Sequence, residues 1–378
     1  MSVVQKRKLK LKKPLVVFNK ILLFICLLCL LLFGFYRYEI SKLKAIGYSE
    51  ISSKKILHDF KQKYIMDLGE NKTLKAAFES PDYKEENLDS YSKIKYHEHK
   101  NLISNINALL EKGYSNNNIN MILDHGNDED VTSFASRDKI KYLEEFYNIS
   151  YAKLRYYDEY VLYSNETGED EETTVLMVNL GLNKGDYTEP FEVDTFSKEM
   201  LVNRHFKIKD ELEPTTIINI DENYTNGEEQ KGDREAVAAL KKMFDDASSQ
   251  GFNLVVNSSY RSFAMQEELC SEYRVIYGDN YVNNYLALPG YSEHQTGLSF
   301  DIGSRNTNVF ANSKEYGWMV DNAYKYGFIL RYTKVGAEIT QFRSEPWHYR
   351  FVGKKIAEYI YENDITFEEY YAMFLDND

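Results

Sequence analysis

An apolar segment near the N-terminus constrains this chain more than any other feature of its sequence. It runs without a charged residue from Ile21 to Tyr36, and Leu15–Phe18 extend the apolar length to about 20 residues. A helix of about that length crosses the hydrocarbon core of a bilayer. The backbone inside lipid must also satisfy its own hydrogen bonds, which a helix does. We therefore expect a transmembrane helix over residues 21–36.

The residues before this segment carry only positive charge, with seven Lys and Arg and no acidic residue in positions 1–20. Basic flanks stay on the cytoplasmic side of a membrane. Residues 1–20 are therefore predicted to be cytoplasmic and residues 37–378 extracellular. A cleaved signal peptide begins in a similar way, but no small-residue cleavage site follows the apolar run. We favour an uncleaved, single-pass anchor.

The chain beyond residue 20 is acidic, with 39 basic against 59 acidic residues. This balance argues against binding to nucleic acid or to anionic lipid. Cys26 and Cys29 lie inside the predicted anchor, which leaves Cys270 alone outside it. Because one cysteine cannot form an internal disulfide, an exported domain must be stabilised by its hydrophobic core or by a metal ion.

Residues 41–165 are predicted to be mostly helical. Ser49 and Ser115 each follow a Gly-Tyr pair and occupy a helix N-cap position, and an apolar pair lies two turns later, Ile56-Leu57 and Ile122-Leu123. This recurrence suggests repeated helical hairpins, although two copies are fewer than a solenoid needs. The pattern leaves open whether the region is a spacer or a binding module.

From about residue 175 short strands alternate irregularly with helices, after an acidic linker or loop over residues 165–174. Strands are expected at 175–180, 216–220, 252–256, 328–332 and 348–351. Helices are expected from Asp233 to Gly251, from Ser262 to about Tyr277, and from Ser313 to Tyr326. The alternation favours an α+β domain, with helices packed on a small, largely antiparallel sheet.

Two short segments carry residues suited to metal chemistry. The first contains His294 and, seven residues later, Asp301; the second is Glu345-Pro-Trp-His348. Catalytic zinc takes three His or carboxylate ligands and keeps one position for water. His294, Asp301 and His348 form such a set, and Gly297 lets the chain turn back between the first two. We predict that they bind one zinc ion per chain.

Glu345 supplies the group that this chemistry still needs. A zinc-activated water requires a base to accept its proton, and the same acid can then protonate a departing amine. Pro346 prevents a regular helix through this segment. We therefore expect the Glu345 carboxylate to lie beside the third ligand without binding the ion, as general base and acid.

These residues resemble a family of zinc peptidases with the motifs SxHxxGxxxD and ExxH, the D-alanyl-D-alanine carboxypeptidases and dipeptidases of the VanY and VanX type. Residues 257–262 also match the family's S-x-Y-R-S segment, and residues 317–332 match its W…YGF-x-x-RY stretch. The likeness is strong over residues 232–360 and weaker back to about 175, which predicts an enzyme domain over 175–363. Ser299 departs from the Ala that is usual in the family, and we expect it to adjust the surroundings of the ligands.

The resemblance implies the remaining site residues. Arg261 is implied to stabilise the tetrahedral intermediate of hydrolysis. Ser292 and Gln266 are candidates for substrate contact, although capping and packing explain them as well. Tyr260 lies in the same matched segment as Arg261, and Trp347, next to the third ligand, fits a pocket wall or the core equally well.

The implied function is that of a membrane-anchored D-alanyl-D-alanine carboxypeptidase, which removes the C-terminal D-Ala from peptidoglycan stem peptides. The motifs do not exclude an L,D-carboxypeptidase that acts on the tetrapeptide stem. A dipeptidase for free D-Ala-D-Ala suits an extracellular domain less well. A non-catalytic cell-wall-binding module is a further alternative, against which Glu345 argues. Residues 41–165 are then a spacer or a wall-binding region, and no feature of the sequence indicates the oligomeric state.

Overall fold

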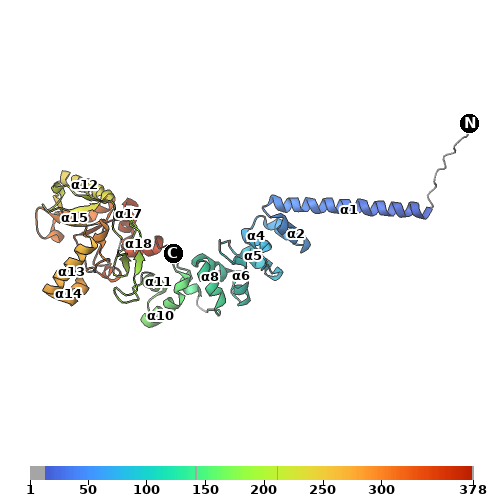
Figure 1. The fold of residues 1–378 in the computed structure, drawn as a ribbon, viewed down its shortest axis with the longest axis horizontal. Coiled ribbons are helices and arrows are strands. Elements are labelled where there is room, and N and C mark those ends of the chain that lie inside the picture. The colour runs from blue at the N-terminus through green and yellow to red at the C-terminus, as the bar shows by residue number, and fades with distance from the viewer. Residues whose placement is uncertain (1–12, 141–142, 211, 377–378) are drawn as a thin grey trace, which may run out of the picture. The chain divides into compact units, whose positions relative to one another are not determined.

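The computed structural model describes residues 13–140, 143–210 and 212–376, so most of the predicted cytoplasmic segment lies outside the described residues. The chain forms two compact units, which divide between Glu144 and Glu145 and can be followed by colour in Figure 1. The limits expected for a spacer, 41–165, and for an enzyme domain, 175–363, are not the limits of these units. The helices that follow residue 147 up to residue 179 belong to the second unit.

One long helix, α1 (Lys13–Ala45), contains the predicted anchor. Its stretch from Val16 to Ala45 has 30 residues, and the most apolar window within it has a mean hydropathy of 2.8 and no buried residue. It is long and apolar enough to cross a membrane. Near its end, Ile40 and Leu43 are buried where α1 contacts α2 (Glu50–His58). The last turns of α1 are therefore part of the first unit.

The first unit is helical, as predicted. The side chain of Ser49 accepts a hydrogen bond from the Ser52 amide at the start of α2, and Ser115 accepts one from the Asn118 amide at the start of α7, so both predicted N-caps are confirmed. The further helices are α3 (Gln62–Leu68), α4 (Lys72–Glu79), α5 (Leu88–Lys93), α6 (Leu102–Glu111), α7 (Asn116–His125) and α8 (Asp128–Ser136). A short helix, α9 (Leu143–Tyr147), spans the division between the units.

A buried tyrosine–asparagine pair ties this unit together. The Tyr91 hydroxyl accepts a hydrogen bond from the Lys84 amide and donates one to Asn107 Oδ1 (2.5 Å). The Asn107 amide in turn donates to the carbonyl of Asp82 (2.7 Å). The buried polar groups of Tyr91 and Asn107 thus have partners, as burial requires.

The same arrangement recurs at the start of the second unit. Tyr160 accepts from the Lys153 amide and donates to Asn179 Oδ1 (2.5 Å), and Asn179 donates to the carbonyl of Tyr151 (2.8 Å). The two tyrosines are 69 positions apart in the sequence, as are the two lysines. This tyrosine–asparagine arrangement therefore occurs in both units. It is not the Gly-Tyr-Ser recurrence at residues 47–49 and 113–115, whose interpretation as repeated helical hairpins stays a prediction.

The prediction for residues 165–180 is wrong. The segment 175–180 is not a strand, because residues up to Asn179 lie in α11 (Glu171–Asn179), which Asp170 caps. The predicted linker is the end of α10 (Tyr157–Thr167), a turn at Gly168 and the start of α11. A short apolar run has too little periodicity to distinguish a buried helix from a strand.

The second unit is α+β, as predicted. Its main sheet has the order β5-β6-β8-β7, with every neighbouring pair antiparallel, and β3 and β4 form a separate antiparallel pair. A parallel pair, β1 with β2, was not expected. The strands are β1 (Phe191–Val193), β2 (Phe206–Ile208), β3 (Ile217–Asn219), β4 (Lys231–Asp233), β5 (Leu254–Ser258), β6 (Ser299–Ser304), β7 (Phe328–Leu330) and β8 (His348–Phe351).

Of the remaining helices in the described residues, three were expected from the sequence and four were not. Asp233, Ser262 and Ser313 cap α12, α13 and α15 with their side chains, as predicted. The helices are α12 (Arg234–Ser249), α13 (Phe263–Tyr277), α14 (Asp279–Tyr285), α15 (Lys314–Asn322), α16 (Ala337–Thr340), α17 (Lys354–Asn363) and α18 (Phe367–Phe374). The last of these lies beyond the predicted end of the domain at residue 363.

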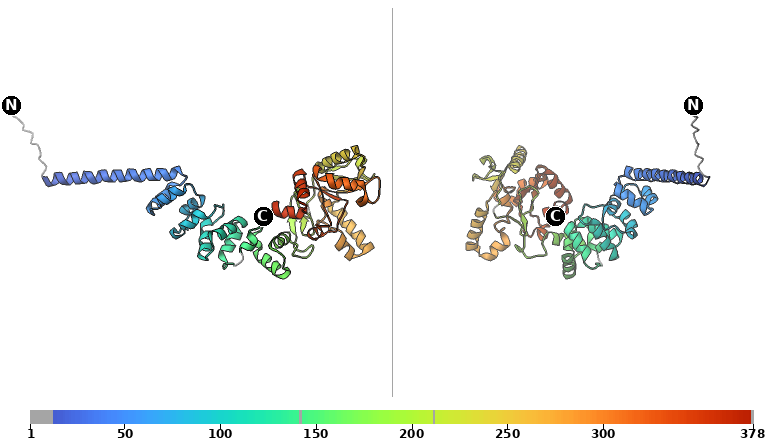
Figure 2. Two further views of the ribbon diagram at one scale, coloured as in Figure 1. Left: turned by 180° about the vertical axis from the view of Figure 1, so that it is seen from behind. Right: turned by 45° about the vertical axis from the view of Figure 1, so that its right-hand side comes forward.

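The main sheet separates two hydrophobic cores; Figure 2 shows the ribbon of this unit from two further directions. Phe328 packs with Phe300 and with apolar residues of α12 and α15, whereas its neighbour Ile329 packs with residues of α11, α17 and α18. Alternate side chains of a strand point to opposite faces, so the sheet is covered on both faces. The strand ends are thereby held rigidly at the place where the motif residues lie.

Candidate metal centre

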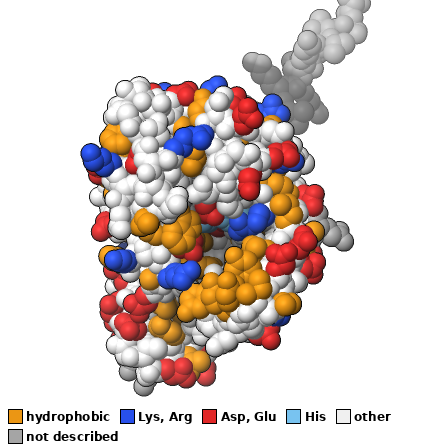
Figure 3. Space-filling model, turned by 90° about the vertical axis from the view of Figure 1, so that its left-hand side faces the viewer, with side chains coloured by type: hydrophobic (Ala, Val, Ile, Leu, Met, Phe, Trp, Pro, Cys, Tyr) orange, Lys and Arg blue, Asp and Glu red, His pale blue; other side chains and the backbone are white. Residues whose placement is uncertain are grey.

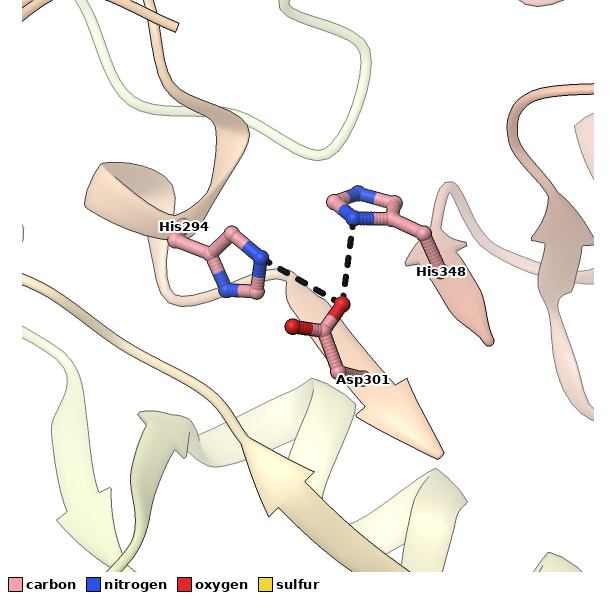
Figure 4. Close-up of side chains that lie close together, drawn as sticks. All are labelled: His294, Asp301 and His348. Carbon is pink, nitrogen blue, oxygen red and sulfur yellow. Dashed lines mark ion pairs between the residues drawn. The ribbon is translucent and has the colours of Figure 1, made fainter. Parts of the chain in front are cut away.

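Three side chains of the two motifs converge at one end of the main sheet (Figure 4). Asp301 on β6 and His348 at the start of β8 are paired across the strands. His294 lies in a 3₁₀ turn, Glu293–Thr296, just before β6. Gly297 ends this turn with φ of +73°, and an added Cβ would lie 2.3 Å from Ile217 Cδ1. Glycine is therefore favoured at the turn that brings His294 back to Asp301.

These three residues, which we call the ligand cluster, place one potential ligand atom each within 4.8 Å of one another. Asp301 Oδ1 lies 3.5 Å from His294 Nε2 and 3.3 Å from His348 Nδ1. The two imidazole rings are nearly perpendicular, with centroids 5.0 Å apart. Both histidines are buried. The set has the composition of a catalytic zinc site with three protein ligands.

Hydrogen bonds on the far side of each ring fix which nitrogen faces the cluster. His294 Nδ1 lies 2.7 Å from the carbonyl oxygen of Ser259 and must donate to it, since a carbonyl only accepts. His348 Nε2 lies 3.2 Å from Glu293 Oε2 and donates to that carboxylate. In the neutral rings, the lone pairs of His294 Nε2 and His348 Nδ1 therefore face Asp301, as metal ligands do.

Asp301 gives an independent sign that a cation fits here. Its Oδ1 is buried and accepts no hydrogen bond in the part of the chain that the structure describes. Leaving a buried carboxylate oxygen unpaired is costly. Burial raises the pKa of Asp301, but attraction to His294 and His348 outweighs it and holds the pKa well below its usual range. The ionised oxygen is thus ready to bind a metal ion.

The two histidines differ in their electrostatics. Burial, helped by Arg261, lowers the pKa of His294 to about 4, so its ring is neutral at pH 7. Burial also lowers the pKa of His348, but the neighbouring carboxylates of Asp301 and Glu293 outweigh burial and raise this pKa to about 9. A metal ion must displace this proton from His348 to bind.

Glu345 lies beside the third ligand. Its Oε2 is 3.8 Å from His348 Nδ1, and its backbone amide donates to the carbonyl of Tyr332 (3.0 Å). Burial raises the pKa of Glu345, with His348 opposing. A carboxylate with a raised pKa can both accept and return a proton near neutral pH.

Arg261 reaches the same place from the end of β5. Its Nε donates to Gln266 Oε1 (2.9 Å) and its Nη1 to Ser258 Oγ (2.7 Å). Burial lowers the pKa of its guanidinium, while the charges of Asp301 and Glu345 oppose the shift. The Arg261 guanidinium is therefore close enough to interact electrostatically with the carboxylates of Asp301 and Glu345.

The other predicted contact residues differ in what surrounds them. Gln266 is buried and holds Arg261 with its oxygen and the Ala287 carbonyl with its nitrogen (2.8 Å), so its amide is engaged within the protein. Ser292 is buried before the His294 turn and makes no side-chain cap. Tyr260 is partly buried, and Trp347 is 36% exposed. Their contacts with a substrate remain predictions.

Glu293 is a residue of this site to which the sequence analysis assigned no role. Its side chain is fully buried, and Oε2 accepts hydrogen bonds from both His348 and Ser299 Oγ (3.0 Å). Its position between Ser292 and His294 was visible, but that position carries no required residue in the motif. Ser299, the one departure from the family pattern, contacts this same carboxylate.

The face that carries the cluster is hollowed. Figure 3 shows histidine at the base of the hollow, between acidic and basic side chains, with hydrophobic side chains along its rim. Such a mixture suits a small polar ligand with an apolar part.

Comparison with known proteins places this part of the chain in a family. Residues 229–354 match the family VanY, D-alanyl-D-alanine carboxypeptidase. The putative carboxypeptidase YodJ of Bacillus subtilis (strain 168) is 41% identical over 179 residues, which are 45% of this chain and 66% of that protein. The chain spans between about half and two thirds of the curated relatives it matches.

Two solved structures are also similar. The LD-carboxypeptidase LdcB is 37% identical, with 49% of this chain and 90% of that chain covered and a TM-score of 0.45. The vancomycin-resistance D,D-pentapeptidase VanY in complex with Zn(II) is 32% identical, with 46% and 98% covered and a TM-score of 0.41. The family match covers both motifs and every residue of the ligand cluster. Through its C-terminal unit, the chain belongs to the VanY family of D-alanyl-D-alanine carboxypeptidases.

Proposed function

We propose that the C-terminal unit is a zinc-dependent carboxypeptidase that removes the terminal D-Ala from peptidoglycan stem peptides. The observation that carries this proposal is the convergence of His294, Asp301 and His348 on one point, with the Glu345 carboxylate 3.8 Å from His348 Nδ1. Zinc bound there would polarise the scissile carbonyl and activate the attacking water.

In this reaction Glu345 moves the proton. It accepts a proton from the water whose oxygen bonds to the carbonyl carbon, and it returns that proton to the nitrogen when the C–N bond breaks. The products are a shortened peptide acid and free D-Ala. The raised pKa of Glu345, caused by its burial, suits a group that must take up and release a proton.

Arg261 stabilises the negative charge that develops on the carbonyl oxygen. Ser258 and Gln266 hold its guanidinium in place, so little reorganisation is needed during the reaction. Gln266 then acts through Arg261 and not by direct contact with substrate. Ser292, Tyr260 and Trp347 are left as candidates for contacts with the peptide.

The proposal is tested with the full chain, purified in detergent and loaded with zinc. Three peptides are incubated with it: a pentapeptide stem ending in D-Ala-D-Ala, the tetrapeptide stem, and the C-terminal amide of the pentapeptide. Mass spectrometry should show loss of one D-Ala from the pentapeptide. The amide should react about ten- to a hundredfold more slowly, because a pocket that pairs a carboxylate leaves donors unsatisfied when the charge is gone.

The same experiment separates the alternatives. Cleavage of the tetrapeptide alone would identify an L,D-carboxypeptidase, and equal cleavage of acid and amide, or a cut inside the stem, would identify an endopeptidase. Zinc binding without cleavage of any peptide would favour a wall-binding module. Glu345→Gln, assayed in parallel, shows whether any cleavage comes from this site.

We also infer that α1 anchors the protein in the cell membrane, with the N-terminus in the cytoplasm and the enzyme outside. The length and hydropathy of α1 and the basic residues before Ile21 support this topology. A protease added to intact cells should digest the C-terminal unit, and the mature protein should begin near residue 1. An N-terminus after Phe35 would instead show cleavage and secretion. Residues 41–165 keep both predicted roles, spacer or wall-binding region.

A further inference from the structure

Behind His348 lies a second group of buried charges, which we call the charge cluster. It consists of Glu293, Arg331, Arg350 and Glu368, whose side chains are at most 1% exposed. Two guanidinium groups thus face two carboxylates. Buried charges of this kind are stable only when they are paired and hydrogen-bonded.

Glu368, on α18, binds one end of this cluster. Its Oε2 accepts from Arg331 Nη1 (2.8 Å) and its Oε1 from Arg331 Nη2 (2.6 Å), a bidentate pair. Asn203 Nδ2 also donates to Oε1 (3.1 Å). Arg331 therefore has both terminal nitrogens occupied by one carboxylate.

The other end of the cluster touches the ligand cluster. Arg331 Nε donates to Glu293 Oε1 (2.7 Å), and Arg350 Nη1 lies 3.4 Å from the same oxygen. The second oxygen of Glu293 accepts from His348 Nε2 (3.2 Å). A continuous chain of contacts thus runs from α18 through Arg331 and Glu293 to a predicted zinc ligand.

We propose that Glu368 is a positioning residue for the metal centre, acting through Arg331 and Glu293 on His348. This inference rests on the proposed function only in that His348 is a zinc ligand. Glu368 lies outside residues 229–354, which match the family, so it adds the C-terminal helix to the site.

The physical reason is charge balance. With Glu368 in place, Glu293 shares two guanidinium groups with a second carboxylate and keeps one oxygen for His348. Without that charge, both cations act on Glu293 alone and weaken its hold on the ring. One uncompensated positive charge would also remain near the zinc ion. Both effects lower zinc affinity, since partners behind a histidine ligand fix its orientation and raise its basicity.

The test compares Glu368→Gln with Glu315→Gln in the full chain. Glu315 is a suitable control because it is also a buried carboxylate of this unit, but it binds Asn306 and the Asn253 amide and contacts neither cluster. Zinc affinity is measured by competition with a chelator, and the thermal midpoint of each metal-free variant is recorded. E368Q should bind zinc about tenfold more weakly, the low end for removal of such partners. E315Q should keep wild-type affinity even where its midpoint falls.

Cobalt substitution gives a second reading, because the visible spectrum of bound Co²⁺ reports ligand geometry. The spectrum should change in E368Q and stay that of the wild type in E315Q. Wild-type zinc affinity together with an unchanged spectrum in E368Q overturns the proposal. If E368Q does not fold, Glu368→Asp replaces it, since the shorter side chain no longer reaches both nitrogens of Arg331; unchanged affinity there overturns the proposal equally.

These measurements need no peptide, so they are separable from the proposed activity. A chain that binds zinc, shows the E368Q effect and cleaves no stem peptide would disprove the carboxypeptidase and leave this inference standing. A wild-type chain that binds no zinc would overturn both.

Discussion

The ligand cluster and the charge cluster meet at the ring of His348, but they differ in how their polar groups are satisfied. In the charge cluster two arginines are matched by two glutamates, and Glu368 takes both terminal nitrogens of Arg331. In the ligand cluster Asp301 Oδ1 accepts no hydrogen bond from any described residue, and it faces two histidine nitrogens. In the charge cluster both carboxylates accept hydrogen bonds from Arg331, although Arg350 Nη1 has only an ion pair with Glu293 and no hydrogen bond among the described residues. The ligand cluster instead leaves a carboxylate oxygen open, which suits the binding of a cation. The charge cluster thus supports the ligand cluster from behind His348.

The largest effect is expected from removing a ligand. His348→Ala should abolish zinc binding and lower peptide cleavage by about three orders of magnitude or more, because the metal ion contributes several kcal/mol to the reaction. Metal content after dialysis and the rate of D-Ala release measure both effects. His58→Ala is the matched control, since His58 is 88% exposed and lies in the first unit. A His348→Ala variant that keeps its zinc would remove this residue from the ligand set.

Glu345→Gln should lower catalytic activity without lowering the zinc content of the ligand cluster. We expect activity to fall about 10²- to 10⁴-fold, the usual contribution of a general base and acid, while zinc remains bound. Metal analysis and steady-state kinetics on the pentapeptide measure the two quantities. Loss of zinc together with activity would show that Glu345 is a ligand and not the base.

Arg331→Met should disrupt the charge cluster. It leaves Glu368 buried with no ion-pair partner among the described residues and Glu293 with Arg350 as its remaining arginine. Removal of one partner from a buried ion pair typically costs about 3–5 kcal/mol of unfolding free energy. Denaturant unfolding of the metal-free protein measures the loss. Lys198→Met is the control, because the Lys198–Glu235 pair is exposed and should contribute at most about 1 kcal/mol. An equal loss of unfolding free energy in the two variants would show that the charge cluster contributes no more to stability than an exposed ion pair.

Removal of zinc by a chelator should have the smallest effect on stability. Binding to the folded state alone stabilises it by about 2.7 kcal/mol when free zinc is 100 times its dissociation constant. The unfolding midpoint of the wild-type chain should therefore rise with zinc concentration, and that of His348→Ala should not. A zinc-independent wild-type midpoint would mean that the ligand cluster does not hold the ion in the folded state.

Much of the local structure of the second unit could be predicted from the sequence. The side chains of Asp233, Ser262 and Ser313 mark the starts of three helices, because a cap is a contact between residues two or three positions apart. The strand expected at 252–256 is shifted to Leu254–Ser258, and β6 was not expected as a strand. These strands are defined by their partners across the sheet, which local patterns do not specify.

For the candidate site, the sequence alone determined the kinds of residue and their spacing. Glycine at position 297 and proline at 346 act on the backbone next to them, so the turn before Asp301 and the break before His348 follow from the chain itself. The tertiary structure decided what lies behind the ligands. Glu368 follows Glu293 by 75 positions in the sequence, and Arg331 links them only because β7 and α18 pack together around one core. Contacts of that range depend on how the whole unit packs, and no local pattern records them.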